Sequence, residues 1–273
     1  MTRAAETTNM ALFCDFENIA LGVRDADYAR FDIAKVLERL LLKGNIVVKK
    51  AYCDWARYKE FKAAMHEASF ELIEIPHVRQ SGKNSADIRM VVDALDLCYT
   101  KEHVDTFVII SGDSDFSPLV SKLRENNKTV IGVGVKNSTS DLLIANCDEF
   151  ISYDDLVRPP SPGARAEPGK TGRKPTRKPK GGTSGPVEDK KQEAWQLMVE
   201  TYEALLEERG EEERIWGSMV KQALKRRNPG FSETHYGFRS FGQLLEEAEA
   251  QGILTLERDE KSGGFILKSS QAS

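Results

Sequence analysis

The sequence predicts an α/β protein whose first half folds into a parallel β-sheet with helices on both faces. Short apolar runs rich in β-branched residues alternate with amphipathic helical patterns from residue 10 to residue 147. Repeated strand–helix order implies right-handed crossovers and a three-layer, Rossmann-like domain. Acidic or small polar residues follow several of the apolar runs, at the sheet edge where open α/β folds place their ligands. At 273 residues and 40% hydrophobic, the chain can also bury a second, smaller core.

Each element of the first half is predicted from its own pattern. The stretch at 31–42 carries apolar residues at a helical spacing that turns one face inward. The run at 106–110, Thr-Phe-Val-Ile-Ile, is short, β-branched and aromatic, which indicates a buried strand. The predicted strands are residues 10–14, 46–52, 71–75, 106–110 and 129–135, and the predicted helices are 31–42, 58–68 and 141–147, together with helices that start near Ser85 and Pro118.

Two carboxylates follow the strand at 106–110. The sequence at 111–116 is Ser-Gly-Asp-Ser-Asp-Phe, so Asp113 and Asp115 sit at the carboxyl end of a buried strand. Like charges so close together repel one another unless a cation or a proton lies between them. The structural alternative is that Asp115, or Ser114 beside it, caps the next helix while Asp113 only occupies a turn.

Two further acids are expected at the same edge of the sheet. Asp15 ends the strand at 10–14, and Asp87 lies in the first turn of a helix that Ser85 is expected to cap. In a parallel sheet, the carboxyl ends of strands and the amino ends of the helices that follow them meet at one edge. The four acids should then converge on one point, where a hard divalent cation is the natural occupant.

At these motifs the chain resembles the NYN domain family, the LabA-like branch of the PIN-like nucleases. The resemblance rests on Asp-Phe-Glu-Asn at 15–18, Ser-Ala-Asp at 85–87 and the segment at 111–116. The stretch Ser-Thr-Ser-Asp-Leu-Leu at 138–143 and the acidic end of the domain at 145–150 also fit. The resemblance covers residues 9–157 and implies a PIN-like fold with a metal-dependent ribonuclease site.

The resemblance implies roles for individual residues. Four acids would hold Mg²⁺ or Mn²⁺, which would activate water for phosphodiester hydrolysis: Asp15, Asp87, Asp113 and Asp115. Asn18 is expected to orient a water or a phosphate oxygen. Ser111 and Ser114 are expected to donate hydrogen bonds to phosphate or to the carboxylates. Asp93 is a weaker candidate because, six residues after Asp87, it should face another side of the helix.

Other titratable residues are weaker still. Asp141 is expected to cap its own helix. The four histidines are too scattered along the chain for a histidine-based mechanism. Among them, His77 follows a predicted strand end and is the one expected near the site, although a structural role is favoured for it.

The composition changes near residue 158. Residues 158–187 are rich in Pro, Gly and Ser and carry many Lys and Arg but few acids. Such a segment cannot bury enough apolar surface to order itself, so it is expected to be a disordered basic linker. Its role is that of a solubilising tether or of an arm that attracts phosphates, and the two are compatible. The expected domains are therefore residues 1–157 and residues 188–273.

Residues 188–273 are predicted to form a small α+β domain of the winged-helix kind. Three helical patterns precede two β-rich runs, at 253–256 and 264–267. The part from 190 to 268 resembles the OST-HTH, or LOTUS, domain, and that resemblance implies RNA binding or protein docking. Without this resemblance, a charged face on a small helical domain would be interpreted as a solvated surface with no binding role. The basic residues that would contact phosphate are Lys221, Lys225, Arg226, Arg227 and Arg239.

Charge and composition bear on several other classes. The net charge of −4 at pH 7 argues neither for nor against nucleic acid. No apolar run approaches the roughly 20 residues of a membrane span, and the first residues lack the apolar core of a signal peptide. The four cysteines are scattered in apolar surroundings, so buried free thiols of a cytoplasmic protein are expected in place of disulfides or zinc ligands.

The predicted function is a cytoplasmic, metal-dependent ribonuclease acting on RNA, expected to be single-stranded, with a C-terminal RNA-binding module. The main alternative is a non-catalytic regulator with a vestigial acidic site, which binds RNA or docks a protein partner through its C-terminal domain. A further alternative is a phosphatase of the haloacid-dehalogenase kind. It would use Asp15 as the nucleophile and Glu17 as the second acid, but no well-placed lysine stands out.

Overall fold

The computed structural model describes residues 8–75, 85–157, 186–209, 214–259 and 263–269. They divide into two compact units. The first closes with a helix that ends at Val157, and the second opens with a helix that begins at Pro186. The predicted linker at 158–187 lies outside the described residues except for its last two positions, and His77 also lies outside them.

The first unit is built on a six-stranded sheet, which is fully parallel as the sequence predicts. The strand order is β3-β2-β1-β4-β5-β6. The chain runs outward from β1 to β3, then returns to β4 and runs outward to β6 on the other side. The boundary between β1 and β4 is therefore the topological switch point, where such sheets bind ligands. The strands are β1 (Asn9–Asp15), β2 (Asn45–Cys53), β3 (Glu71–Glu74), β4 (Thr106–Ile110), β5 (Thr129–Gly134) and β6 (Glu149–Ser152).

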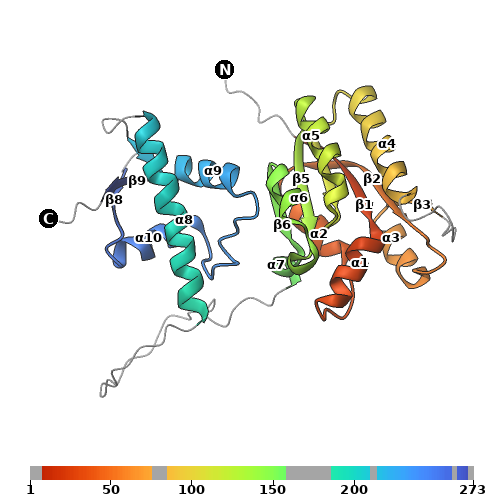
Figure 1. The fold of residues 1–273 in the computed structure, drawn as a ribbon, viewed down its shortest axis with the longest axis horizontal. Helices are drawn as coiled ribbons and strands as arrows, with labels where there is room; N and C mark the ends of the chain where they lie inside the picture. The colour runs from red at the N-terminus through yellow and green to blue at the C-terminus, as the bar shows by residue number, and fades with distance from the viewer. Residues whose placement is uncertain (1–7, 76–84, 158–185, 210–213, 260–262, 270–273) are drawn as a thin grey trace, which may run out of the picture. The chain divides into compact units, whose positions relative to one another are not determined.

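Helices connect the strands and cover the sheet (Figure 1). Apolar side chains of α4 and α5 form one core cluster with residues of β1 and β4, in which Phe13 and Phe107 stack with their ring centroids 5.9 Å apart. The α-helices are α1 (Phe16–Asp25), α2 (Ile33–Leu41), α3 (Lys62–Glu67), α4 (Ser85–Thr100), α5 (Ser117–Glu125), α6 (Asp141–Asn146) and α7 (Tyr153–Val157), with 3₁₀ turns η1 (Lys59–Phe61), η2 (Ser114–Phe116) and η3 (Lys136–Ser138).

The elements agree with the sequence prediction at their centres and differ from it at several ends. The strand at 106–110 has the predicted bounds. The predicted helix at 58–68 is a 3₁₀ turn followed by the short α3. Three elements were not predicted, namely α1, β6 and α7. Of these, α1 matters most because it begins at Phe16, directly after the candidate ligand Asp15.

The second unit combines three helices with a small antiparallel sheet of order β7-β9-β8. The predicted order of three helices and then two strands is present, and the two-residue β7 is an addition. Gly217 begins α9 against this core, where a side chain would place its Cβ 2.9 Å from Leu245 Cδ1. The elements are α8 (Pro186–Arg209), β7 (Ile215–Trp216), α9 (Gly217–Arg227), α10 (Phe241–Ala250), β8 (Leu254–Arg258) and β9 (Phe265–Ser269).

Two compositional expectations can be compared with the structure. All four cysteines are buried free thiols, as predicted: Cys14, Cys53, Cys98 and Cys147. Within the described ranges, no helix has both the length and the apolar character needed to cross a membrane.

Candidate active site

The candidate site lies at the switch point, where β1 ends at Asp15 and β4 is followed by Ser111. Asp15 is only 7% exposed and Ser111 is fully buried. The Ser111 amide donates to the carbonyl of Val133 at 3.0 Å, which prolongs the pairing of β4 with β5 by one residue. The Ser111 hydroxyl then donates to Asp15 Oδ2 at 3.1 Å. This hydrogen bond joins the ends of the two central strands, 96 positions apart in the chain.

Asp15 also caps the helix that follows it. Its backbone is extended, and its Oδ1 accepts a hydrogen bond from the amide of Asn18 at 3.3 Å. Both carboxylate oxygens therefore already hold a hydrogen bond, one from α1 and one from Ser111. The remaining lone pairs of the two oxygens are what the carboxylate can offer to a ligand.

Asn18 acts as a tie between two segments of the site. Its Oδ1 accepts a hydrogen bond from the amide of Gly112 at 2.8 Å. The carbonyl thus holds the loop after β4 against α1. The prediction that Asn18 orients a water or a phosphate oxygen stays a prediction. Gly112 is needed here because a Cβ would lie 2.5 Å from the carbonyl oxygen of Ser138.

Asp113 caps the turn that leads into α5. Its Oδ1 accepts from the amide of Asp115 at 2.9 Å, and its own amide donates to Ser111 Oγ at 3.2 Å. The prediction that Ser114 or Asp115 provides the cap is thus wrong, because the 3₁₀ turn η2 begins at Ser114 and Asp113 caps it, while α5 begins at Ser117 with no side-chain cap. Ser114 is half-buried in this turn, and Asp115 is exposed.

Asp87 approaches the same point from α4. It lies in the first turn of that helix, as predicted, and is half-buried. Its pKa is raised from the usual 3.8 to about 6, first by burial and then by the charges of Asp113, Asp115 and Glu17. The structure therefore brings Asp87 within electrostatic reach of both acids of the loop after β4.

The carboxylate of Asp15 is also affected by neighbouring acids of this group. Its pKa is raised from 3.8 to about 7, first by burial and next by the carboxylate of Asp87, against the lowering effect of the hydrogen bonds from Asn18 and Ser111. Asp113 raises it further. All four predicted acids thus act on one another, directly or through a common neighbour, and a divalent cation among them would relieve their repulsion.

The donor set suits a hard divalent ion in its chemistry, since it consists of carboxylate oxygens. The side chains are nevertheless not gathered at ligand distances. Within the part of the chain that the structure describes, no three His, Cys, Asp or Glu residues lie close enough together to hold an ion. The carboxylates would have to move toward one another to share Mg²⁺ or Mn²⁺.

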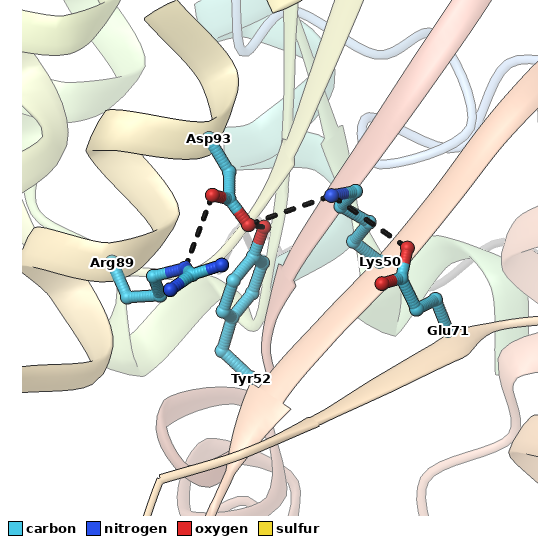
Figure 2. Close-up of polar contacts among 5 residues, drawn as sticks. All are labelled: Lys50, Tyr52, Glu71, Arg89 and Asp93. Carbon is cyan, nitrogen blue, oxygen red and sulfur yellow. Dashed lines mark hydrogen bonds and ion pairs between the residues drawn. The ribbon is translucent and has the colours of Figure 1, made fainter. Parts of the chain in front are cut away.

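Asp93, the weaker acid candidate on α4, belongs to a different group of residues (Figure 2). It accepts hydrogen bonds from the hydroxyl of Tyr52 at 2.9 Å and from Arg89 Nε at 3.1 Å, and Lys50 Nζ lies 3.5 Å away. Lys50 also pairs with Glu71 at 3.6 Å. Burial and the Asp93 carboxylate raise the pKa of Tyr52, so its hydroxyl stays protonated and donates. This network ties α4 to β2.

Two further charged residues lie beside the site: Glu17, which the sequence suggested only as the second acid of a phosphatase, and Arg57, which it did not suggest. Glu17 lies in the first turn of α1 and is one of the acids that raise the pKa of Asp87. Arg57, in the loop after β2, donates to Glu17 Oε1 at 2.9 Å. The motif at 15–18 contains Glu17, but nothing in the sequence pairs it with a residue 40 positions later.

The predicted basic cluster of the second unit lies on α9. Lys221 pairs with Glu233 at 2.8 Å, and its Nζ lies 5.9 Å from the centre of the Phe241 ring. Arg226 and Arg227 are exposed in the last turn of the helix, which also contains Lys225. The structure thus places Lys221, Lys225, Arg226 and Arg227 on one helix, with Lys221 paired to an acidic residue, whereas Arg239 lies in the segment before α10.

The fold and the acidic switch point define a class of protein. Residues 9–154 match the NYN domain family, so the chain belongs to the NYN domain family. NYN domains are part of the PIN-like nuclease superfamily, in agreement with the six-stranded parallel sheet. The OST-HTH or LOTUS resemblance of the second unit stays a prediction.

Similar proteins match about half of this chain. A crystal structure of a protein of unknown function from Vibrio parahaemolyticus is 26% identical, with a TM-score of 0.50 over 57% of this chain and 98% of that one. An uncharacterised protein of Methanocaldococcus jannaschii is 29% identical over 124 residues, which are 45% of this chain and 48% of that one. The meiosis regulator and mRNA stability factor 1 of Xenopus tropicalis is 24% identical over 149 residues, 54% of this chain and 9% of that one. The chain thus spans about half of the first curated relative and less than a tenth of the second.

Proposed function

We propose that the chain is a metal-dependent ribonuclease that hydrolyses RNA phosphodiesters at the switch point between β1 and β4. The observation that carries the proposal is the group of four acids, in which burial and then the charges of neighbouring carboxylates raise the pKa values of Asp15 and Asp87. A stable core has no use for such repulsion, whereas a bound divalent cation would relieve it. Membership of the NYN domain family supports a nuclease-like reaction.

The residues of the site have separable roles in this proposal. The four acids would hold Mg²⁺ or Mn²⁺, which when bound lowers the pKa of a coordinated water and neutralises charge on the reacting phosphate. Ser111 holds Asp15 through Oδ2, and the α1 amide of Asn18 holds Oδ1, so that carboxylate is fixed before any ligand arrives. Asn18 fixes the loop that carries Asp113. These bonds orient Asp15 and the loop in advance, and movement of the other acids toward the cation would complete the site.

RNA is the proposed substrate class. The matching relative from Xenopus is named as an mRNA stability factor, which favours RNA over DNA for this chain too. Binding would draw on Lys221, Lys225, Arg226 and Arg227 in the second unit, which we propose to be an RNA-binding module in a cytoplasmic enzyme. The alternative to RNA binding is that the same module docks a protein partner.

A non-catalytic regulator is the second candidate function. It is favoured by one observation, namely that no three of the described acids lie at ligand distances. In that case the acids would be vestigial, and RNA or a protein partner would be held by the second unit.

One experiment separates the two candidates. The full chain is incubated with labelled single-stranded RNA, duplex RNA and DNA in Mg²⁺, Mn²⁺ or EDTA, beside the variants Asp115→Asn and Asp141→Asn. Asp141 is an exposed acid in the first turn of α6, where Ser140 provides the cap, and it is a matched control. We expect metal-dependent RNA cleavage that Asp115→Asn lowers by at least about 100-fold and Asp141→Asn leaves within twofold. Equal rates of cleavage by wild type and Asp115→Asn would contradict the ribonuclease proposal.

A further inference from the structure

The loop that follows β2 stands beside the acidic site and is firmly anchored. In the parallel pairing of β1 with β2, Asp15 lies opposite Tyr52, so the loop from residue 54 leaves the sheet next to the end of β1. Trp55 is 1% exposed. Its amide donates to Glu74 Oε1 at 2.9 Å, and its ring nitrogen donates to the carbonyl of Ile73 at 3.2 Å. The loop is therefore held in one place on the carboxyl edge of the sheet.

Arg57 is the cation that this loop presents to the acids. Its Nη1 donates to Glu17 Oε1 at 2.9 Å, and about half of its side chain, 51%, is exposed. Glu17 follows Asp15 by two residues and adds to the repulsion at Asp87. Arg57 thus borders the group of carboxylates through Glu17, and a guanidinium has five donors, of which this contact uses one.

Tyr58 supplies an aromatic ring at the same place. The ring lies 5.7 Å from that of Phe16, centre to centre, and 6.5 Å from that of Phe61, and the side chain is half-buried. The guanidinium carbon of Arg57 lies 6.0 Å from the centre of the ring. Burial and next the charge of Glu17 raise the pKa of Tyr58, so its hydroxyl stays protonated. An arginine beside a supported aromatic ring is the combination that binds an unstacked nucleotide.

We propose that Arg57 and Tyr58 form a subsite for the nucleotide next to the scissile phosphate of single-stranded RNA. Arg57 leaves Glu17 to bind the neighbouring phosphate bidentately, and the ring of Tyr58 stacks on the adjacent base. The pairing with Glu17 keeps the guanidinium at the rim until RNA arrives. A duplex keeps its bases stacked and paired, so it cannot use the ring. This subsite rests on the proposed ribonuclease function and gives it a preference for single strands.

The subsite answers an electrostatic difficulty of the proposed reaction. Carboxylates repel a phosphate chain, so RNA can approach them only if a cation lies nearby. A fixed cation bordering the acids lowers the cost of bringing RNA to them, without entering the cation site itself. Loss of Arg57 should therefore weaken binding and leave the chemical step almost unchanged.

The test compares Arg57→Ala and Tyr58→Leu with Arg39→Ala in the full chain. Arg39 is exposed in the last turn of α2, just before β2 begins at the opposite edge of the sheet, so it matches the charge change away from the site. Binding of a fluorescently labelled single-stranded RNA and of an RNA hairpin is measured in EDTA at several salt concentrations, and cleavage is measured in Mn²⁺. Melting curves establish that each variant is folded.

We expect Arg57→Ala to raise Kd and KM for the single strand by about fivefold or more, with kcat within threefold, and to reduce the salt slope of log affinity by about 0.7. Tyr58→Leu should weaken the single strand by about fivefold or more and the hairpin by less than twofold. Arg39→Ala should change neither. If Arg57→Ala behaves like Arg39→Ala in EDTA, the subsite is wrong while the nuclease stands. If wild type fails to cleave, the ribonuclease fails, and the binding measurements in EDTA still decide on the subsite.

Discussion

Two carboxylates on α4, Asp87 and Asp93, differ sharply in what surrounds them. Asp93 has a tyrosine hydroxyl, a guanidinium and an ammonium group around it, with heavy atoms at 2.9, 3.1 and 3.5 Å (Figure 2). Asp87, six residues earlier, is influenced by Asp113, Asp115 and Glu17, all of the same sign, and its pKa is raised to about 6. One helix thus carries a carboxylate whose charge is compensated and one whose charge is not.

The comparison shows how a structural acid can be told from a candidate functional one. A buried carboxylate with hydrogen-bond donors around it stabilises the fold, because removing it leaves those donors without their acceptor. A carboxylate surrounded by carboxylates destabilises the fold through charge repulsion, which a bound cation would relieve. Asp87 and Asp93 should therefore respond in opposite ways to substitution.

The largest expected effect is the loss of RNA cleavage in the variant Asp87→Asn. We expect RNA cleavage to fall by about 100-fold or more, because one of the four proposed cation ligands loses its charge, while the melting temperature without metal stays the same or rises. Asp96→Asn is the matched control, since Asp96 is exposed on the same helix. Cleavage measured at saturating Mn²⁺ and RNA checks this, and equal rates for the two variants would contradict it.

The next largest effect is on stability, through Asp93→Ala. This change leaves Tyr52, Lys50 and Arg89 without their common acceptor, so we expect the free energy of unfolding to fall by about 2 kcal/mol. Cleavage per folded molecule should change by less than threefold. Urea denaturation followed by circular dichroism measures the first quantity, and an unaltered midpoint would show that the network does not hold α4.

The stability of the metal-free protein should also depend on pH in a way that identifies the acids. Asp15 and Asp87 have folded pKa values of about 7 and 6, above their usual 3.8. The folded state therefore holds protons that the unfolded state has lost between pH 4 and pH 7. The stability that these protons provide is full below pH 4 and is lost as the pH rises through 6 to 7.

The variant Asp87→Asn tests this dependence. At pH 8 in EDTA, its free energy of unfolding should exceed that of wild type by about 1 kcal/mol, after allowance for solvent screening at a half-exposed group. This difference in the free energy of unfolding should shrink toward pH 4. Denaturation curves at four pH values between 4 and 8 give the comparison. A difference that does not vary with pH would mean that Asp87 titrates normally.

The smallest expected effect is on the Mn²⁺ concentration needed for cleavage, and it distinguishes the anchoring of α4 from a general loss of stability. Tyr52→Phe removes the hydroxyl that binds Asp93, and Tyr153→Phe removes a hydroxyl that accepts from the amide of Asp32 at 2.8 Å. Each should cost about 1 kcal/mol. Only Tyr52→Phe should also raise the Mn²⁺ concentration needed for half-maximal cleavage, by about twofold, because α4 carries Asp87. A rise of the same size in Tyr153→Phe would remove the distinction.

Much of this arrangement could be predicted from the sequence, because it depends on local patterns. The strand at 106–110 has a composition that fits no other element, and an acid after a strand in a parallel sheet must lie at the carboxyl edge. The convergence of Asp15 and Asp113 follows from topology alone. The weaker standing of Asp93 follows from helical geometry, since six residues is not a whole number of turns.

The contacts that hold the site could not be predicted in this way. The bonds from Ser111 to Asp15 and from Gly112 to Asn18 each join residues more than 90 positions apart, so they depend on how neighbouring strands stagger. The pairing of Arg57 with Glu17 depends on the path of a loop. The cap at Asp113 depends on a 3₁₀ turn whose start differs by a few residues from the predicted helix.

Thermal stabilisation by Mn²⁺ tests most directly the claim that the four acids share one cation. A cation that binds only the folded chain raises the melting temperature by mass action. We predict that millimolar Mn²⁺ raises the melting temperature of the first unit within the full chain by about 4 °C or more, that Asp96→Asn keeps this rise, and that Asp87→Asn loses most of it. A melting temperature that is unchanged across the titration, or a rise of equal size in both variants, would contradict the claim.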